Sequence, residues 1–354
     1  MGGEPDFDDS HALLEQVNRA LENATPLRIQ GANSKAFLGR IVPGEVLDTR
    51  AHRGIVSYDP TELVITARCG TPLSELNEAL EAAQQMLPCE PPSFGDDATV
   101  GGMIASGLSG PRRPWSGSVR DFVLGTRVIT GHGKHLRFGG EVMKNVAGYD
   151  LSRLMAGSFG ALGVITEVSL KVLPKPRQCL SISLEMDTER ALLRLAEWGQ
   201  QPLPISAACH DGENLHLRLE GGDGSVTAAH DRLGGEPLDS VYWADLNEHR
   251  LSFFDEDQPL WRLSVPHNTP RLSLPGRQLI DWGGAQRWLK SDAEAGFIRN
   301  IVEEVGGHVT CYSHGLIDSP FQPLPAALLR YHRSLKQQLD PRGIFNPARL
   351  YAEL

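Results

Sequence analysis

Glycine residues gather in two groups between Ala98 and Pro174, each at the edge of a run of β-branched residues. Glycine enters positive φ at little cost, so such groups mark places where the backbone turns tightly or approaches a ligand. Successive backbone N–H groups in these turns form concave anion sites, and a large dinucleotide is the expected ligand. The first group comprises Gly101, Gly102, Gly107, Gly110 and Gly117, and the second comprises Gly157, Gly160 and Gly163, ahead of a predicted strand at 164–172.

A third candidate phosphate site is the loop after the short predicted strand LRIQ. Gly31 permits a turn, and Asn33, Ser34 and Lys35 offer small or cationic groups that hydrogen-bond phosphate oxygens. A solvated surface turn is the alternative for this loop taken alone. Because the later glycine groups follow it in the chain, the phosphate-binding interpretation of this loop is favoured.

Two common nucleotide-binding motifs are excluded by spacing. A Rossmann fingerprint needs G-x-G-x-x-G between a strand and a helix, whereas GSFGALG leads into a predicted strand. The sequence contains no G-x-x-x-x-G-K-[ST], so a P-loop site is not expected either.

The motifs resemble a known family when they are taken together in order. They are TVGGMIASGLSG, SGSVRDFVLG, KNVAGYDLSRLMAGSFGALGVITEV and the terminal DPRGIFNPARLYAEL, with IQGANSKAFLGR before them and QLIDWGGAQRWLK between the last two. The chain resembles flavoproteins of the vanillyl-alcohol-oxidase (PCMH) type, and among them the FAD-binding subunits E of bacterial glycolate oxidase (glycolate dehydrogenase). The resemblance implies an α+β fold, with a two-lobed PCMH-type FAD-binding domain followed by a ferredoxin-like α+β cap domain.

The same resemblance implies which residues bind FAD. This chain departs from the family at one position, where many members have Asn and it has Ser106. The Ser hydroxyl can still make a hydrogen bond, but the amide oxygen and NH2 group of Asn are missing. No His lies in the IQGANSK loop, so covalent attachment of flavin there is excluded and non-covalent FAD is expected. The implied cofactor-binding residues are Gln30, Gly31, Ala32, Asn33, Ser34, Lys35, Thr99, Val100, Gly101, Gly102, Ser106, Gly107, Ser116, Gly117, Ser118, Lys144, Asn145, Gly157, Gly160, Gly163, Val164 and Ile165.

Composition excludes several classes of protein. The 354 residues carry a formal net charge of −10, which argues against a nucleic-acid surface. No apolar run reaches the roughly 20 residues that a membrane helix requires. The acidic start MGGEPDFDDSH lacks the regions of a signal peptide. We therefore expect a cytoplasmic protein, and the resemblance implies that any contact with the inner membrane is made through partner subunits.

The cysteines indicate neither disulfides nor an iron–sulfur cluster in this chain. The five lie far apart with no C-x-x-C spacing, which is typical of reduced thiols. A metal site is not expected either. His210 and His216 lie in CHDGENLH, which differs in register from the HxGDGNLH-like metal motif of related 2-hydroxy-acid dehydrogenases and sits in a predicted hairpin about Asp211-Gly212.

Periodicity and turn residues predict the organisation of the chain. We expect two lobes of the FAD-binding domain at 1–97 and 98–176, a cap at 177–325, and a C-terminal helix and tail at 326–354 that return to the FAD-binding domain. Apolar spacing predicts helices at 10–23, 189–198, 298–305 and 326–339, and another that opens with Thr71 as N-cap and Pro72 at its first position. IDWGGAQRWLK is predicted to join a strand end to a helix. The aromatic-containing stretch 231–268 is either a surface insertion or a partner-binding face.

Oxidation of a 2-hydroxy acid by flavin needs a cationic group for the substrate carboxylate and a base for the hydroxyl proton. The sequence assigns neither role, so the catalytic residues stay unknown. Arg113, Arg330, His308 and His332 are candidates, each with the alternative of an ordinary surface Arg or satisfied His.

The resemblance leads to one functional hypothesis with two alternatives. The chain is expected to be the FAD-binding subunit of a glycolate dehydrogenase complex that oxidises a small 2-hydroxy acid. Its expected partners are a second FAD-linked subunit and an iron–sulfur subunit. In one version the partner oxidises the substrate and this chain relays electrons. The alternatives are a self-sufficient flavin dehydrogenase acting on a hydroxy acid or sugar, and a flavin-free assembly subunit.

Overall fold

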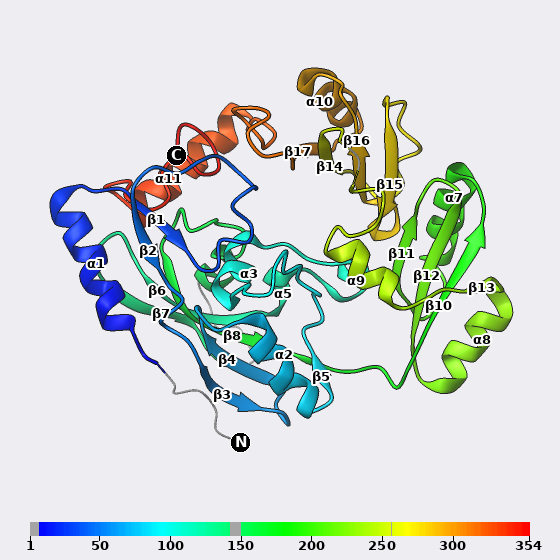
Figure 1. Cartoon of the computed structure of the whole chain (residues 1–354), viewed down its shortest axis with the longest axis horizontal. Coiled ribbons are helices and arrows are strands. Elements are labelled where there is room, and N and C mark those ends of the chain that lie inside the picture. Colours follow the sequence, from blue (N-terminus) through cyan, green and yellow to red (C-terminus); the bar gives the residue numbers. More distant parts are fainter. Residues whose placement is uncertain (1–6, 142–149, 256) are drawn as a thin grey trace. The chain divides into compact units, whose positions relative to one another are not determined.

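The computed structural model describes residues 7–141, 150–255 and 257–354, and these form two compact units (Figure 1). Unit 1 takes in the described parts of Met1–Ser109, Gly117–Pro174 and Pro323–Leu354. Unit 2 consists of Gly110–Ser116 and the described parts of Lys175–Gln322. The predicted second lobe, 98–176, included residues 110–116, which the structure groups with unit 2 instead.

Unit 1 contains a five-stranded antiparallel sheet in the order β3-β4-β8-β6-β7. Its middle strand β8, Val164–Lys171, is rich in β-branched residues and almost wholly buried, as expected for a strand covered on both faces. Helices α2 and α3 contribute Leu76, Leu80 and Met103 to the core that covers this sheet. The remaining elements of this part are β3 (Ile55–Asp59), β4 (Val64–Arg68), α2 (Leu73–Ala82), β5 (Gln85–Met86), α3 (Val100–Ser106), α5 (Val119–Phe122), β6 (Val123–Ile129), β7 (His135–Gly139), α6 (Leu151–Leu154) and β9 (Leu173–Pro174).

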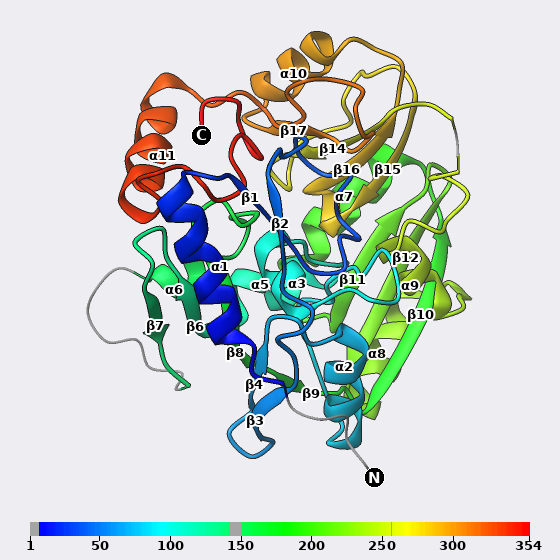
Figure 2. The same ribbon diagram turned by 60° about the vertical axis from the view of Figure 1, so that its left-hand side comes forward.

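A second core in unit 1 packs helix α1, Ser10–Asn23, against a parallel pair of short strands (Figure 2). The pair is β1 (Leu27–Gln30) and β2 (Glu45–Asp48). Leu13 and Val17 of α1 lie in this core with Leu27, because residues four apart share one face of a helix. The loop that follows β1 therefore starts from a fixed strand end.

The C-terminal segment belongs to unit 1. Helix α11, Ala326–Leu339, is followed by a tail that runs beside β1, where Leu27 N–H donates to Ile344 O and Asn346 N–H donates to Leu27 O. Lys336 is the buried residue of this otherwise mostly exposed helix. The tail thus extends the β1–β2 pair on its open edge.

Unit 2 contains an eight-stranded sheet in the order β13-β10-β12-β11-β15-β16-β14-β17. Numbered within each half, both sets of four strands have the order 4-1-3-2 of a ferredoxin-like unit, and they meet edge to edge at β11 and β15. In the first half, α8 packs on β10 and β12 (Figure 1). The elements are α4 (Arg113–Ser116), β10 (Gln178–Glu185), α7 (Thr188–Trp198), β11 (Ile205–His210), β12 (Asn214–Gly221), α8 (Asp223–Leu233), β13 (Glu236–Pro237), α9 (Val241–Asn247), β14 (Leu260–Ser264), β15 (Arg277–Asp281), η1 (Trp282–Gly284), β16 (Gln286–Lys290), α10 (Ala295–Glu304) and β17 (His308–Cys311).

The predicted helices at 10–23, 189–198, 298–305 and 326–339 are confirmed to within a few residues at their ends, as is the hairpin at Asp211-Gly212. The helix predicted after IDWGG is wrong. Gly283 and Gly284 have φ of 62° and 104° and turn the chain directly from β15 into β16. At the start of α2, Pro72 is the N-cap, because Thr71 Oγ1 is engaged with the backbone of Gly54.

Aromatic residues of the 231–268 stretch lie mostly inside unit 2. Trp243, Phe253 and Trp261 are at most 4% exposed, and Trp243 Nε1 donates to Ser181 Oγ. An exposed aromatic partner face would have left these rings in solvent. The stretch packs into its own unit instead.

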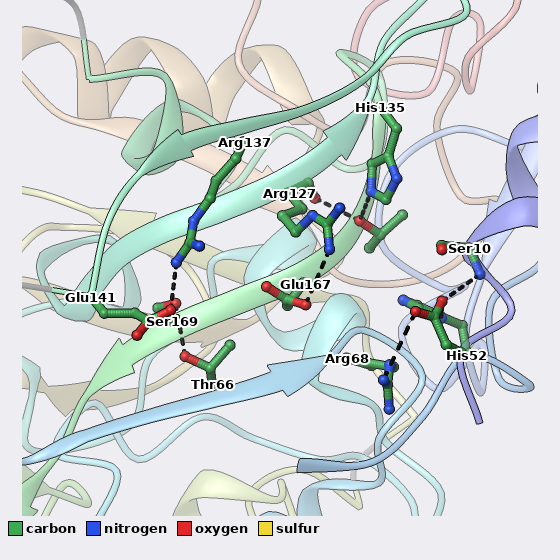
Figure 3. A network of polar contacts seen from close by, with 12 residues as sticks. Ser10, His52, Thr66, Arg68, Arg127, His135, Arg137, Glu141, Glu167 and Ser169 are labelled. Carbon is green, nitrogen blue, oxygen red and sulfur yellow. Dashed lines mark hydrogen bonds and ion pairs between the residues drawn. The ribbon is translucent and has the colours of Figure 1, made fainter. Parts of the chain in front are cut away.

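A polar network lies on the five-stranded sheet of unit 1 (Figure 3). His135 Nε2 donates to Thr166 Oγ1 over 2.8 Å, and Thr166 in turn donates to Arg127 O. Nearby, His52 is only 3% exposed and accepts a hydrogen bond from Asp9 N–H at its Nδ1. Burial lowers the pKa of His52 and of His135, and the charge of Arg127 acts in the same direction on both.

These two histidines predict acid sensitivity of unit 1. The unfolded chain takes up protons at them near pH 6.5, whereas the folded chain resists protonation until lower pH, so acidification favours unfolding. We expect the free energy of unfolding to fall between pH 7 and pH 5, and to fall less in His135→Gln, whose amide can still donate to Thr166. Urea unfolding across this pH range measures the effect. His11→Gln, at an exposed position of α1, is the control, and identical slopes in all three proteins would contradict the prediction.

Candidate functional site

A pocket with about 910 Å³ of empty space, part of it open to solvent, lies within unit 1. Four stretches of sequence supply most of its lining: the end of β1 with its loop, α3 with its N-cap, the second glycine group with β8, and the C-terminal tail. Thr49 and Cys69, which follow β2 and β4, complete it. The lining residues are Arg28, Ile29, Gln30, Gly31, Ala32, Asn33, Ser34, Lys35, Val42, Thr49, Cys69, Thr99, Gly101, Gly102, Ala105, Ser106, Phe159, Gly160, Gly163, Ile165, Asn346 and Arg349.

The loop after β1 presents unpaired main-chain donors. Within the described part of the chain, the N–H groups of residues 31–34 donate to no protein acceptor. Asn33 adopts φ of 62°, the left-handed conformation that turns successive N–H groups toward a common point. Ser34 Oγ and Lys35 Nζ both donate to Ser93 O, at 2.8 and 3.0 Å, which holds the loop in place. This arrangement suits an anionic oxygen.

The start of α3 approaches its neighbours so closely that only glycine fits. A Cβ at Gly101 would lie 2.7 Å from Cys69 Cβ and 3.0 Å from Cys69 O. A Cβ at Gly31 would collide with Thr99 Oγ1, the hydroxyl that caps α3 by accepting from Gly102 N–H. These glycines therefore let two segments of backbone meet at the pocket wall.

The charge of the lining fits a diphosphate. Its charged side chains are the cations Arg28, Lys35 and Arg349, and none of the described lining residues is a carboxylate. Burial raises the pKa of Cys69 to about 12, so this thiol stays neutral. The free N–H groups, the cations and the glycine-lined wall together fit FAD, whose phosphates would bind these N–H groups and cations.

Two lining residues from the C-terminal tail were not identified from sequence. Asn346 Oδ1 accepts from Ile29 N–H at 2.7 Å, and its Nδ2 donates to Phe159 O at 2.6 Å. Arg349 donates to the carbonyls of Lys35, Ala36 and Arg40. The tail thus holds both the loop after β1 and the second glycine group. Thr49 and Cys69 have no local sequence signal, because they reach the pocket through the strands that they directly follow, β2 and β4.

Most predicted residues line the pocket, and the others lie behind it or apart from it. Val100 and Val164 are fully buried in the cores of unit 1, and Gly107, the C-cap residue of α3, packs against Gly157. Ser118 N–H donates to Asp121 Oδ2 at the start of α5, next to Gly117, and Ser116 lies in unit 2. Lys144 and Asn145 lie outside the described residues.

None of the four candidates for substrate chemistry lines this pocket. Arg330 and His332 are on α11, where Arg330 lies over Tyr331 and His332 bonds to Leu328 O. Arg113 and His308 are in unit 2, on α4 and β17. The pocket of unit 1 therefore offers cofactor binding without an identified acid or base.

The histidines of CHDGENLH have protein partners. His210 Nε2 bonds to Met186 O, and His216 Nε2 bonds to Asp211 Oδ2 at 3.0 Å. Over the described residues, no group of three or more His, Cys, Asp or Glu side chains is arranged to hold a metal ion. No helix in the same residues has the length and apolar character needed to cross a membrane.

The fold and the pocket define an FAD-binding flavoprotein, and residues 8–139 match the family model described as an FAD binding domain. Over 347 residues the chain is 64% identical to the glycolate oxidase subunit GlcE of Escherichia coli (strain K12), covering 98% of this chain and 99% of that protein. The chain therefore belongs to the family of FAD-binding glycolate oxidase subunits.

More distant relatives share part of the chain. Glycolate oxidase subunit GlcD of Bacillus subtilis (strain 168) is 32% identical over 52% of this chain and 38% of its own length. A D-lactate dehydrogenase of Anaerostipes hadrus is 33% identical over 46% of this chain and 34% of its own. A solved structure of alkyldihydroxyacetonephosphate synthase has the same fold, with a TM-score of 0.68 at 18% identity over 98% of this chain and 76% of that one.

The contact between Gly101 and Cys69 makes a prediction about cofactor binding. In Gly101→Ala the added methyl group must displace the backbone of Cys69, and overpacking of this kind costs about 1–3 kcal/mol. We expect FAD affinity to fall about tenfold or more, measured by titrating apoprotein with FAD. Gly296→Ala, on the open face of α10, is the control and should bind FAD normally. Unchanged FAD affinity in Gly101→Ala would show that α3 is not part of the cofactor site.

Proposed function

We propose that this chain binds FAD non-covalently in the pocket of unit 1 and serves as the FAD-binding subunit of a glycolate oxidase complex. The complex oxidises glycolate to glyoxylate and passes the electrons on between subunits. The observation that carries the proposal is the 64% identity to GlcE along almost the full length of both chains. The free N–H groups at 31–34 support it independently.

The residues of the pocket bind and orient the cofactor. The loop at 31–35, which Arg349 holds in place, would bind the phosphates, and Gly101 and Gly102 would let the backbone of α3 approach the cofactor. Asn346 keeps the loop and the second glycine group at a fixed separation. When bound, FAD would supply a hydride acceptor for the oxidation of a hydroxy acid and a donor of single electrons to a one-electron acceptor.

The electrons leave through other subunits in this proposal. The five cysteines are far apart in sequence, and over the described residues no three His, Cys, Asp or Glu side chains are grouped as metal ligands, which supports an iron–sulfur cluster in another subunit. A second FAD-linked subunit and an iron–sulfur subunit would complete the path. The complex would lie in the cytoplasm and contact the membrane only through those partners.

A relay role is the second candidate, and the chemistry of the pocket favours it. Proton abstraction from a substrate hydroxyl needs a base with a pKa near the working pH. Among the described residues that line the pocket, Cys69 is the only ionisable group besides the three cations, and its pKa of about 12 keeps it protonated. In this version glycolate is oxidised in a partner subunit and the FAD of this chain carries electrons onward.

One set of assays tests the proposal and separates the two versions. We expect the purified chain, reconstituted with FAD, to show flavin absorption near 450 nm. A denaturant should release this flavin from the protein. The complex purified from native cells should reduce a dye with glycolate, and the complex carrying Gly101→Ala should lose this activity. Dye reduction by the chain alone would refute the relay version. Absence of bound flavin in both the chain and the complex would refute the proposed function.

A further inference from the structure

A buried ion pair in unit 1 ties the C-terminal segment to the second glycine group. Lys336 on α11 and Asp340, just after the helix, are 8% and 1% exposed. Lys336 Nζ donates to Asp340 Oδ2 at 2.8 Å. It also donates to Ala161 O and to Phe345 O, at 2.7 Å each. An ammonium group has three N–H donors, so these acceptors use all of them. We call Lys336 and Asp340 the clasp.

The carboxylate of the clasp holds the start of the tail. Asp340 Oδ2 accepts from Phe345 N–H at 2.8 Å, and Asp340 Oδ1 accepts from Ile344 N–H at 3.2 Å. Asp340 is itself fixed in place, because Gly131 N–H donates to Leu339 O and a Cβ at Gly131 would lie 2.5 Å from Asp340 Cα. Both charged side chains of the clasp therefore hydrogen-bond to the backbone of the tail.

The next residue of the tail, Asn346, lines the cofactor pocket. Its main-chain N–H donates to Leu27 O, and its side-chain amide joins Ile29 N–H to Phe159 O. A Cβ at Gly160 would lie 2.6 Å from Asn346 Nδ2, so this amide rests directly on the second glycine group. Asn346 has φ of 38°, in the left-handed region that non-glycine residues adopt only where their surroundings hold them. The direction of its side chain therefore depends on the backbone that the clasp holds.

The clasp itself lies outside the pocket. Neither Lys336 nor Asp340 is among the described residues that line the pocket, whereas Gly160 and Gly163, on either side of Ala161, both are. Direct hydrogen bonds thus join the clasp to two walls of the pocket, the tail and the second glycine group. All of these contacts are made within unit 1.

We propose that Lys336 and Asp340 are positioning residues for FAD that act through Asn346. By fixing the backbone at residues 344–346, they set where the Asn346 amide lies between the loop after β1 and the second glycine group. This inference rests on FAD binding in the pocket of unit 1. It means that an ion pair outside the pocket sets the affinity for the cofactor.

Cofactor titration of variants tests the inference. We expect Lys336→Met, which removes the ammonium group and keeps a long side chain, to bind FAD about tenfold more weakly than wild type, because coupling between two sites typically changes affinity about 5- to 150-fold. Asp340→Asn is the second variant and should weaken binding less, since its amide oxygen can still accept from Phe345 N–H. Leu80→Ala, in the α2 core of the same unit, is the matched control. It destabilises unit 1 without removing a contact of the clasp, so the folded protein should bind FAD normally.

A double-mutant cycle shows whether the clasp acts through Asn346. Asn346→Ala removes both side-chain hydrogen bonds to the pocket walls and should weaken FAD binding by itself. If Lys336 acts through this amide, Lys336→Met adds little to the loss of affinity in Asn346→Ala, because residues that act as one unit are not additive. Two independent effects on affinity would multiply instead.

Hydrogen exchange of the FAD-free chain gives a readout that does not depend on the cofactor. The Asn346 amide, which donates to Leu27 O, should exchange faster in Lys336→Met than in wild type, because the tail opens locally more often. In Leu80→Ala, faster exchange should be found mainly around α2.

The outcomes are distinguishable. Wild-type FAD affinity in either clasp variant, equal weakening in Lys336→Met and Leu80→Ala, or losses that multiply in the Lys336→Met and Asn346→Ala double variant would overturn this inference and leave the proposed function standing. Absence of bound FAD in both the wild-type chain and the native complex would overturn both.

Discussion

The cofactor pocket depends on one buried ammonium group. Lys336 Nζ donates to the Asp340 carboxylate at 2.8 Å and to the carbonyls of Ala161 and Phe345 at 2.7 Å each. Burial lowers the pKa of this lysine, and the charge of Asp340 opposes that shift. A buried cation is tolerated only when each of its donors is satisfied. The three acceptors therefore fix α11, the tail and the turn before β8 in one arrangement.

The tail that Lys336 holds in place also contacts the pocket lining. Phe345 precedes Asn346, whose amide bonds to both Ile29 and Phe159, and Arg349 then holds the carbonyls of the loop after β1. These side chains thus hydrogen-bond mainly to main-chain groups, and the main-chain N–H groups of residues 31–34 are left available to a ligand. A site of this kind is pre-formed, because its donors are set by packing and not by flexible side chains.

Two walls of the pocket could be predicted from the sequence, because glycine residues indicate where the backbone turns tightly or approaches a neighbour closely. Gly101 and Gly160 marked two walls of the pocket without any knowledge of the fold. Asn346 and Arg349 could not be assigned in this way, since their partners Ile29 and Arg40 lie 317 and 309 positions earlier and no local pattern encodes those distances. The Gly283-Gly284 pair was misread: both glycines have positive φ and turn the chain from one strand into the next, where a helix was predicted.

The parallel contact between β1 and the tail has a consequence for biogenesis. Leu27 pairs with Phe345, so the strand before this loop gains its second neighbour only once the distant segment around Phe345 has been synthesised. Because such distant pairing closes late, a nascent chain holds an incomplete cradle. Under the proposed function, flavin would bind only after the segment around Phe345 has paired with β1.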